Sequence, residues 1–417
     1  MKPLISKKNI ILFAALVFFQ IGLQFILPYE TKVWEDHDIA VNLVNEGEMY
    51  YLNDGARNHT FQFPVYTSFL ALGYAVFGFH SEWGILLNIL VHALTFFLFI
   101  ELFGFIIHYF FYQLKEKYKF IIIYGTALIF FFHPAILFYT LFHIHPLSFN
   151  IFSLFLGLFY SFRFAFSPTK NNAVVTGIII GICMLDRATV LLTLIPAGLI
   201  LWQKISFKEL FYKFSLVCFF SLMMISPWLI RNYITDGIFG FESSAAKNIW
   251  KGVLYHSEGG NYLLNGETYY AALSETELLS LGKMSPVEQR DFFRFKYYEI
   301  WKNDPAHVVK MFFVKLKNFW WFRKHAGEEW GSLKNYLLIY KLGYLFAIIL
   351  LLRLWYNHFN KVFILMSFPI ALSLLQSYFY VEMRHRIAIE PWLLFLAFVS
   401  LCILADEYFI KMNSVNE

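Results

Sequence analysis

The feature that most constrains this chain is the recurrence of apolar runs of 18 or more residues along its length. A run of that length, folded as a helix, crosses the roughly 30 Å of hydrocarbon in a bilayer. Transmembrane strands would instead give alternating segments of about ten residues, which are absent. Only 15% of the 417 residues are charged, against roughly 25% in soluble domains. The sequence therefore predicts an all-α polytopic membrane protein.

We expect a bundle of about ten transmembrane helices, at 10–28, 84–112, 120–140, 146–166, 173–186, 188–203, 214–230, 335–355, 362–380 and 389–406. Lys and Arg collect on cytoplasmic loops. Lysines precede the first span, and basic residues recur on alternate connections, near Lys117, Lys170, Lys208 and Lys361. This pattern predicts a multi-pass protein of the cell inner (plasma) membrane with both termini in the cytoplasm.

One apolar segment, 64–79, is short and begins with a proline. If it crossed the membrane, every later loop would change sides and the lysine clusters would lie outside. We therefore expect it to lie in the outer interface, or to re-enter from it, within a first external loop at 29–83. Three parts follow: an N-terminal transmembrane module (1–230), a small mixed external region (231–334) and C-terminal transmembrane helices (335–417).

The external region at 231–334 contains two helix starts. Ser285-Pro286-Val287-Glu288 has the pattern of a capping box with proline at the first helical position, and it predicts a helix to about Asn303. Asp304-Pro305 then begins a second helix that is apolar on one face and basic on others. Such a helix is expected along the membrane surface; the alternative is packing against a neighbouring domain.

The three cysteines all lie in apolar stretches, so disulfides and thiolate metal sites are not expected. The chain has no nucleic-acid motif, no Walker loop and no glycine-rich dinucleotide fingerprint. We expect no cofactor; a divalent metal is possible, but no pattern indicates one. His143 and His145 are two residues apart and do not share a helical side, which argues against a metal pair.

Acidic residues are concentrated directly after the first span, where Glu35, Asp36 and Asp38 lie within four residues, next to Trp34. Carboxylates at a helix start favour the helix macrodipole, which is one explanation. The other is a general base at the membrane surface. The residues alone leave both open.

Cationic residues recur at the outer ends of other predicted spans. Arg231 follows the seventh span, Arg384 and Arg386 follow the ninth, and Asp186-Arg187 lies between two short spans. Guanidinium groups bind phosphate oxygens in a bidentate way, so an anionic lipid phosphate is one partner. The alternatives are interfacial anchoring or headgroup contact for these arginines, and a local pair between Asp186 and Arg187.

The order of these motifs resembles the GT-C superfamily of membrane glycosyltransferases, near the family-39, aminoarabinose-transferase and protein mannosyltransferase types. The similarity covers nearly the full length. It rests on WEDHDIAVNL from Trp34 to Leu43, Pro64-Val65-Tyr66, Leu185-Asp186-Arg187, PWLIRNY at 227–233 with Asn248-Ile249-Trp250 and Gly252, and Arg384-His385-Arg386. The chain departs from many members in its first acidic motif, and it has His143 and His145 where a glutamate is often found.

The resemblance implies inverting transfer of a sugar from a polyprenyl-phosphate carrier to a lipid, glycan or protein acceptor on the outer face. Glu35, Asp36 or Asp38 would act as the base, and Arg231, Arg384, Arg386 and Arg187 would bind the donor phosphate. The expected groove residues are Trp34, Tyr66, Trp228, Asn232, Tyr233, His143, His145 and Trp250. The alternatives are a flippase or transporter for a lipid-linked sugar, and a glycan polymerase or ligase.

Overall fold

The computed structural model of the chain describes residues 7–27, 29–53, 56–321 and 334–415. Helices dominate this part of the chain. Those of the N-terminal half are α1 (Lys7–Ile26), α2 (Glu35–Glu46), α3 (Pro64–Phe77), α4 (Ser81–Phe110), α5 (Glu116–Phe131), α6 (Pro134–Phe142), α7 (Leu147–Phe166), α8 (Lys170–Met184), the 3-10 helix η1 (Ala188–Thr193) and α9 (Leu194–Trp202).

The second half continues with helices of very different lengths. They are α10 (Phe207–Asp236), α11 (Ala245–Lys251), the 3-10 helix η2 (Tyr269–Ala272), α12 (Glu275–Leu281), α13 (Pro286–Asn303), α14 (Pro305–Trp320), α16 (Lys334–Asn357), α17 (Phe359–Tyr378), α18 (Met383–Ile387) and α19 (Glu390–Val415).

Among the described residues, seven helices are long and apolar enough to cross a membrane: α1, α4, α7, α10, α16, α17 and α19. An eighth crossing results if α5 and α6 are one span, bent by 48°. Pro134 follows the bend; a proline has no backbone N–H and disfavours helical geometry in the residue before it. The chain is thus a multi-pass helical membrane protein by helix length and apolarity.

The predicted count of about ten spans is not confirmed. The segments predicted at 173–186 and 188–203 form α8 and the η1–α9 pair, which belong to the shorter apolar helices of 10 to 17 residues. The segment predicted at 64–79 is also short: α3 has 14 residues, with Pro64 in its first turn. Fourteen residues give about 21 Å of helix, less than the hydrocarbon thickness.

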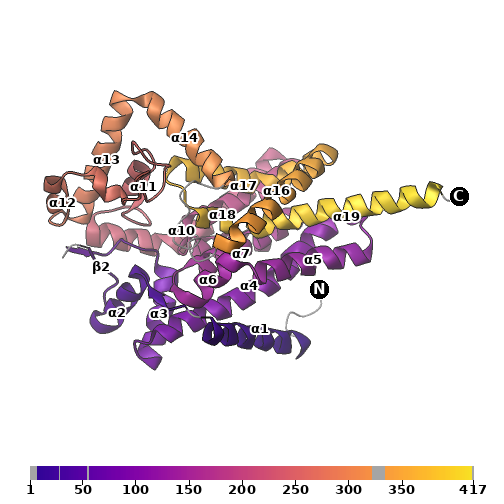
Figure 1. Cartoon of the computed structure of the whole chain (residues 1–417), viewed down its shortest axis with the longest axis horizontal. Coiled ribbons are helices and arrows are strands. Elements are labelled where there is room, and N and C mark those ends of the chain that lie inside the picture. Colours follow the sequence, from indigo (N-terminus) through magenta and orange to yellow (C-terminus); the bar gives the residue numbers. More distant parts are fainter. Residues whose placement is uncertain (1–6, 28, 54–55, 322–333, 416–417) are drawn as a thin grey trace.

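Several of the short elements gather at one end of the bundle. In Figure 1, α2, the β2 strand and α11 to α13 lie at that end, while the start of α1 and the C-terminal end of α19 lie at the other. We refer to the first as the loop end. Polar and irregular segments are thereby separated from the apolar helices, as the bilayer requires of unpaired backbone.

The strands are short and form two separate pairs. β1 (Lys32–Val33) pairs in parallel with β4 (His143–Ile144), with Lys32 opposite His143. β2 (Tyr51–Asn53) and β3 (Ala56–Asn58) form an antiparallel hairpin. The first pair joins the segment before α2 to the segment before α7, two parts of the chain more than 100 residues apart.

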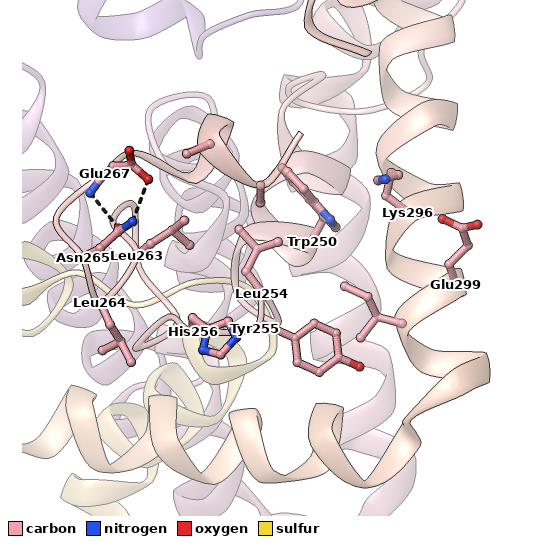
Figure 2. Close-up of a pocket in the computed structure, with 13 residues that line it drawn as sticks. Trp250, Leu254, Tyr255, His256, Leu263, Leu264, Asn265, Glu267, Lys296 and Glu299 are labelled. Atoms are coloured by element: carbon pink, nitrogen blue, oxygen red, sulfur yellow. Dashed lines mark hydrogen bonds between the residues drawn. The ribbon is translucent and has the colours of Figure 1, made fainter. Parts of the chain in front are cut away.

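The external helices start as predicted. Ser285 caps α13 in a capping box with Glu288, Pro286 stands in the first turn, and the helix ends at Asn303. Figure 2 shows Lys296 and Glu299 on α13, across a pocket from the loop that carries Asn265 and Glu267. The next helix, α14, buries Val308, which packs in a cluster with Val253 and Met311. One face of α14 therefore packs against the external region. This agrees with the alternative expectation for this helix, packing against a neighbouring domain.

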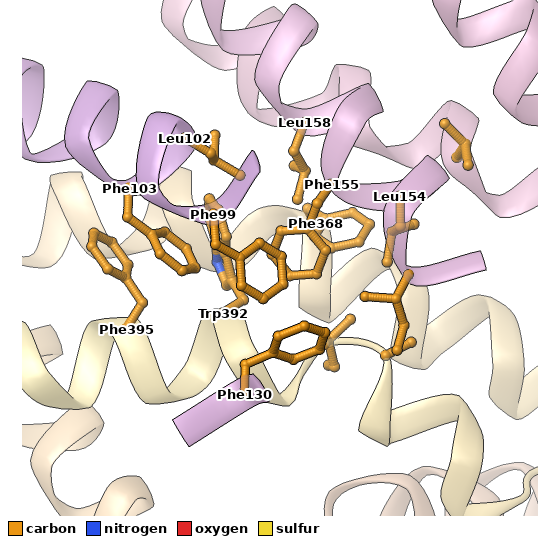
Figure 3. Close-up of a cluster of buried hydrophobic side chains, with 14 of the residues drawn as sticks. Phe99, Leu102, Phe103, Phe130, Leu154, Phe155, Leu158, Phe368, Trp392 and Phe395 are labelled. Atoms are coloured by element: carbon orange, nitrogen blue, oxygen red, sulfur yellow. The ribbon is translucent and has the colours of Figure 1, made fainter. Parts of the chain in front are cut away.

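The core of the bundle is aromatic. Phe99 and Phe103 of α4 meet Phe155 of α7, with ring centroids 4.3 Å apart for Phe99 and Phe155, and Phe103 stacks on Phe395 of α19 at 4.4 Å (Figure 3). The Nε1 atom of the fully buried Trp392 donates to the Leu365 carbonyl at 2.9 Å. Inside lipid, helices associate through such packing and hydrogen bonds rather than through the hydrophobic effect.

Small residues allow the closest helix contact. A β-carbon on Gly177 or Gly181 of α8 would overlap backbone atoms of α10. The Ser221 hydroxyl of α10 donates to the Gly177 carbonyl at 2.9 Å, which adds an interhelical hydrogen bond. The four-residue spacing of these glycines is the small-residue pattern of closely packed membrane helices.

Candidate active site

A cavity of about 670 Å³ lies where the loop end meets the bundle. Its walls come from the start of α2, the turn before α7, the turn between α8 and η1, α11, the loop after α11 and the segment around α18. Seven of the predicted site residues line it: Trp34, Glu35, Asp36, Tyr66, His145, Arg187 and Arg384. Most of the motifs that carried the resemblance therefore meet in one place.

The β1–β4 pair brings two walls of this cavity together. Because Val33 is paired with Ile144, the next residues on each strand, Trp34 and His145, become neighbours. Their rings are 5.1 Å apart in an edge-to-face arrangement. The Arg384 guanidinium lies 5.6 Å from the centre of the Trp34 ring, within the range of a cation–π contact.

The three predicted acids occupy different environments. Glu35 begins α2 and lines the cavity half-buried; its carboxylate has no ion pair or hydrogen bond with any other described residue. Asp36 is 3% exposed, and burial, together with the nearby Glu35 and Asp186 charges, raises the pKa of its carboxyl well above the usual value. Asp38 is exposed and does not line the cavity. Glu35 is thus the acid placed best to accept a proton from a bound molecule.

Asp186 is a further acid of the cavity, at the turn that ends α8. Both its carboxyl oxygens are buried without a hydrogen bond among the described residues. Burial raises the pKa of Asp186 to about 7, although the nearby Ser153 hydroxyl and the Arg187 charge act in the opposite direction. Asp186 therefore changes charge near neutral pH.

Two arginines supply the permanent positive charge. Arg187 follows Asp186, and its Nε donates to the Thr189 hydroxyl at 3.0 Å, which fixes the side chain over the start of η1. Burial lowers the pKa of Arg187, but a guanidinium stays protonated in proteins at neutral pH. For Arg384, burial also opposes the charge, yet Tyr380, Tyr139 and Glu382 raise its pKa above the ordinary arginine value.

Lys251 adds a cation whose charge depends on pH. It is the last residue of α11, 5% exposed, and its Nζ donates to the Asn261 side-chain oxygen at 2.8 Å. Burial, with the nearby Lys247 and Arg384 charges, lowers the pKa of Lys251 to about 7, even though Glu382 and Glu242 favour the charged form.

The residues of the PWLIRNY motif lie away from the cavity. Arg231 donates to the Met49 carbonyl at 2.7 Å and to the His59 carbonyl, so it ties the first external loop to α10. Trp228 donates to the Phe241 carbonyl at 3.1 Å, and Asn232 to the Gly240 carbonyl at 2.8 Å. Tyr233 is 61% exposed. The motif shapes the turn that follows α10.

Three other predicted residues also point elsewhere. Arg386 is 1% exposed, and its Nε donates to Glu390 at 2.7 Å. His143 is buried in β4, with its Nδ1 3.3 Å from the Phe138 carbonyl. Trp250 is 1% exposed and lines a second cavity on the other side of α11.

Lys247, Lys251 and Tyr380 line the cavity but were not among the predicted site residues, and Asp186 was predicted only as a local partner of Arg187. A signal for the lysines was present: Lys247 and Lys251 are four residues apart, and so share a helix face, directly around the Asn248–Trp250 motif. Tyr380 had no signal, since aromatic residues occur throughout the chain. In the described part of the chain, no group of three or more His, Cys, Asp or Glu side chains is arranged to hold a metal ion.

No family model matches the chain, and no curated protein does. Among solved structures, the crystal structure of ArnT from Cupriavidus metallidurans bound to undecaprenyl phosphate is similar, with a TM-score of 0.49 and 12% sequence identity. The match covers 95% of this chain and 60% of that chain, so this chain spans about three fifths of the length of that protein.

Proposed function

We propose that the chain is an inverting glycosyltransferase, which moves a sugar from a polyprenyl-phosphate donor to an acceptor. One observation carries this proposal. A single cavity holds Glu35, whose carboxylate has no ion pair or hydrogen bond within the described part of the chain, together with the guanidinium groups of Arg187 and Arg384. A base and fixed cations at the edge of a membrane bundle are what transfer from a lipid phosphate requires.

In this mechanism, the Glu35 carboxylate accepts the proton of the acceptor hydroxyl. The acceptor oxygen forms a bond to the anomeric carbon while the bond from that carbon to the phosphate oxygen breaks, with inversion. The electron pair leaves with the polyprenyl phosphate, whose growing charge Arg187 and Arg384 stabilise. A preorganised hydrogen-bond donor beside a developing charge raises the reaction rate about 10²–10³-fold. Burial and the neighbouring Glu35 and Asp186 charges raise the pKa of Asp36, so a second negative charge beside Glu35 is disfavoured.

Charge distribution supports an extracytoplasmic position for the cavity. Basic residues of separate connections meet near the end opposite the loop end: Lys361 donates to the Phe110 carbonyl at 2.8 Å, and Lys115 pairs with Asp406 at 2.5 Å. Both sites lie at the termini of long helices away from the cavity. By the positive-inside rule this basic end is cytoplasmic, and the loop end then faces outward.

The rival proposal from the sequence is a flippase or transporter of lipid-linked sugars. Transporters place their substrate sites near the middle of the bilayer, at breaks in spanning helices. Here α11 and the start of α2, which line the cavity, lie at the loop end (Figure 1), which favours an enzyme. A glycan polymerase or ligase uses similar lipid donors and differs from the first proposal in its acceptor.

The test is turnover by the purified full chain with a panel of polyprenyl-phosphate sugars and membrane extract as the source of acceptor. Wild type is compared with Glu35→Gln, and with Asp38→Asn as the matched control outside the cavity. We expect Glu35→Gln to lose at least 10³-fold in transfer rate and to bind donor normally, while Asp38→Asn keeps its rate. Full activity in Glu35→Gln would exclude Glu35 as the base. Movement of donor across liposomes without transfer would favour the flippase.

A further inference from the structure

A second cavity, of about 760 Å³, lies inside the external region. It has no lining residue in common with the first cavity, and one wall separates the two cavities. On one side it is bounded by the loop that carries His256, Leu264, Asn265 and Glu267 (Figure 2). On the other side are Lys296 and Glu299 of α13.

The dividing wall consists of α11 and the loop after it. On α11, Lys247 and Lys251 face the first cavity, and Trp250 faces the second. The loop is a hairpin-like turn with bridges between Ser257 and Leu263 and between Tyr262 and Thr268, closed by Gly266 at a φ of 89°. Its Asn261 and Tyr269 line the first cavity, so both cavities depend on one ordered partition.

The second cavity combines an apolar surface with planar polar groups. Tyr255 is 45% exposed and stacks on His307, with ring centroids 4.2 Å apart, which holds the tyrosine ring in place. The Asn265 side-chain nitrogen donates to Glu267 at 2.6 Å, so the amide and the carboxylate lie side by side at the exposed edge of the cavity. The Glu299 carboxylate lines the same space and has no ion pair or hydrogen bond with another described residue.

The charge of the cavity argues against an anionic ligand. Its cation, Lys296, is engaged by Glu277 at 2.8 Å, while Glu267 and Glu299 add two carboxylates. Carboxylate oxygens accept hydrogen bonds from hydroxyl groups, an amide both donates and accepts, and a tyrosine face covers an apolar ring surface. A site with these groups fits a molecule with many hydroxyls and flat apolar faces.

We infer that this cavity binds a neutral oligosaccharide, as the distal part of a glycan acceptor whose reactive end reaches the first cavity. The assignment to an acceptor rests on the proposed function, whereas the binding of carbohydrate can be tested alone. Of the acceptor classes left open by the sequence, glycan is thereby preferred over lipid and protein. The partition separates the distal sugars in this cavity from the cations of the first cavity, which would bind the donor phosphate.

The experiment measures binding of cellotetraose, maltotetraose, mannotetraose and chitotetraose to the full chain in phospholipid nanodiscs, by saturation-transfer NMR. Nanodiscs avoid detergents with sugar headgroups, which would compete. The cavity variants are Tyr255→Ala and Glu299→Gln. The matched controls are Tyr298→Ala, on α13 but outside the cavity and 57% exposed, and the exposed Glu275→Gln. Melting temperatures of all variants are recorded beside binding, so that a misfolded variant is recognised.

We expect at least one tetrasaccharide to bind wild type, Glu35→Gln and both controls, and to bind each cavity variant at least tenfold more weakly. Failure of all four sugars to bind, equal binding in the cavity variants, or binding of a peptide panel at this place would overturn the inference. Donor turnover is measured on the same samples. Sugar binding without turnover would refute the proposed function but keep a carbohydrate site; turnover without sugar binding would refute the site alone.

Discussion

The Nζ atom of Lys251 lies 3.9 Å from the centre of the Tyr380 ring. The same atom donates to Asn261, whose backbone N–H donates in turn to the Glu382 carboxylate at 2.9 Å. The end of α11 is therefore fastened to the segment that carries Arg384. These contacts hold Lys251 and the segment of Arg384 in fixed positions, and fixed cations are the condition for electrostatic catalysis.

Donor affinity should fall as the pH rises from 6 to 8. Lys251, with its pKa lowered to about 7, loses its positive charge over this interval, and Asp186, with its pKa raised to about 7, gains a negative one. Both changes make the cavity less favourable for a phosphodiester, whose own charge is constant there. We expect a polyprenyl-phosphate hexose to bind about three- to tenfold more weakly at pH 8.

The affinity is measured by titration at pH 6, 7 and 8. Lys251→Arg keeps its charge, so it should bind nearly as well at pH 8 as at pH 6, apart from the effect of Asp186. Lys251→Met should bind the donor weakly at all three pH values, and its affinity should change less with pH than that of wild type. An identical pH profile in wild type and Lys251→Met would show that Lys251 does not face the donor.

Loss of Arg384 should lower donor affinity, whereas loss of Arg231 should lower the stability of the fold. Arg384 lines the cavity, so Arg384→Ala should weaken donor binding at least tenfold with a small change in melting temperature. Arg231 satisfies the carbonyls of Met49 and His59. Its replacement by alanine leaves those carbonyls without that partner, at about 1–3 kcal/mol of stability, while the donor affinity of the folded fraction stays within twofold. The reverse assignment of effects would restore Arg231 as the phosphate ligand.

The sequence predicted the multi-pass helical class, and seven of its candidate residues line one cavity in the structure. These residues belong to motifs at the ends of apolar runs, where topology alone puts them at one face. The direction in which each side chain points was harder to predict. Arg384 and Arg386 are two residues apart on α18, about 200° around a helix, so only one of them can face the cavity. The contacts of Arg231 with carbonyls more than 170 residues away had no local signal.

Asp186 should make the protein less stable at high pH. Its folded-state pKa of about 7 lies above the ordinary value of 3.8, so its contribution to stability is fully present below pH 3.8 and is lost as the pH rises through 7. A shift of about three pKa units corresponds to a loss of stability on the order of 4 kcal/mol above pH 8.

The variant Asp186→Asn has no such loss. Its melting temperature relative to wild type should therefore be several degrees higher at pH 8.5 than at pH 5, with thermal unfolding followed in detergent at both values. An equal difference at the two pH values would contradict a buried, titrating Asp186.

Arg386 and Glu390 should behave as a buried ion pair whose members depend on each other. Glu390 also contacts His133 at 3.1 Å and the Tyr340 hydroxyl, so the pair joins α18 and α19 to the bend between α5 and α6 and to α16. Arg386→Met leaves the Glu390 carboxylate, 3% exposed, without its cation. The expected loss is about 3–5 kcal/mol of stability.

The double variant Arg386→Met with Glu390→Gln removes both charges and should recover most of that loss, because no unpaired buried charge remains. Arg294→Met is the control: Arg294 and Asp291 form an exposed pair on α13, 3.7 Å apart, and such pairs contribute about 0–1 kcal/mol. Melting temperatures of the two single variants, the double variant and the control give the coupling directly. If the double variant is as unstable as the sum of its single variants, Arg386 and Glu390 do not stabilise the protein as a pair.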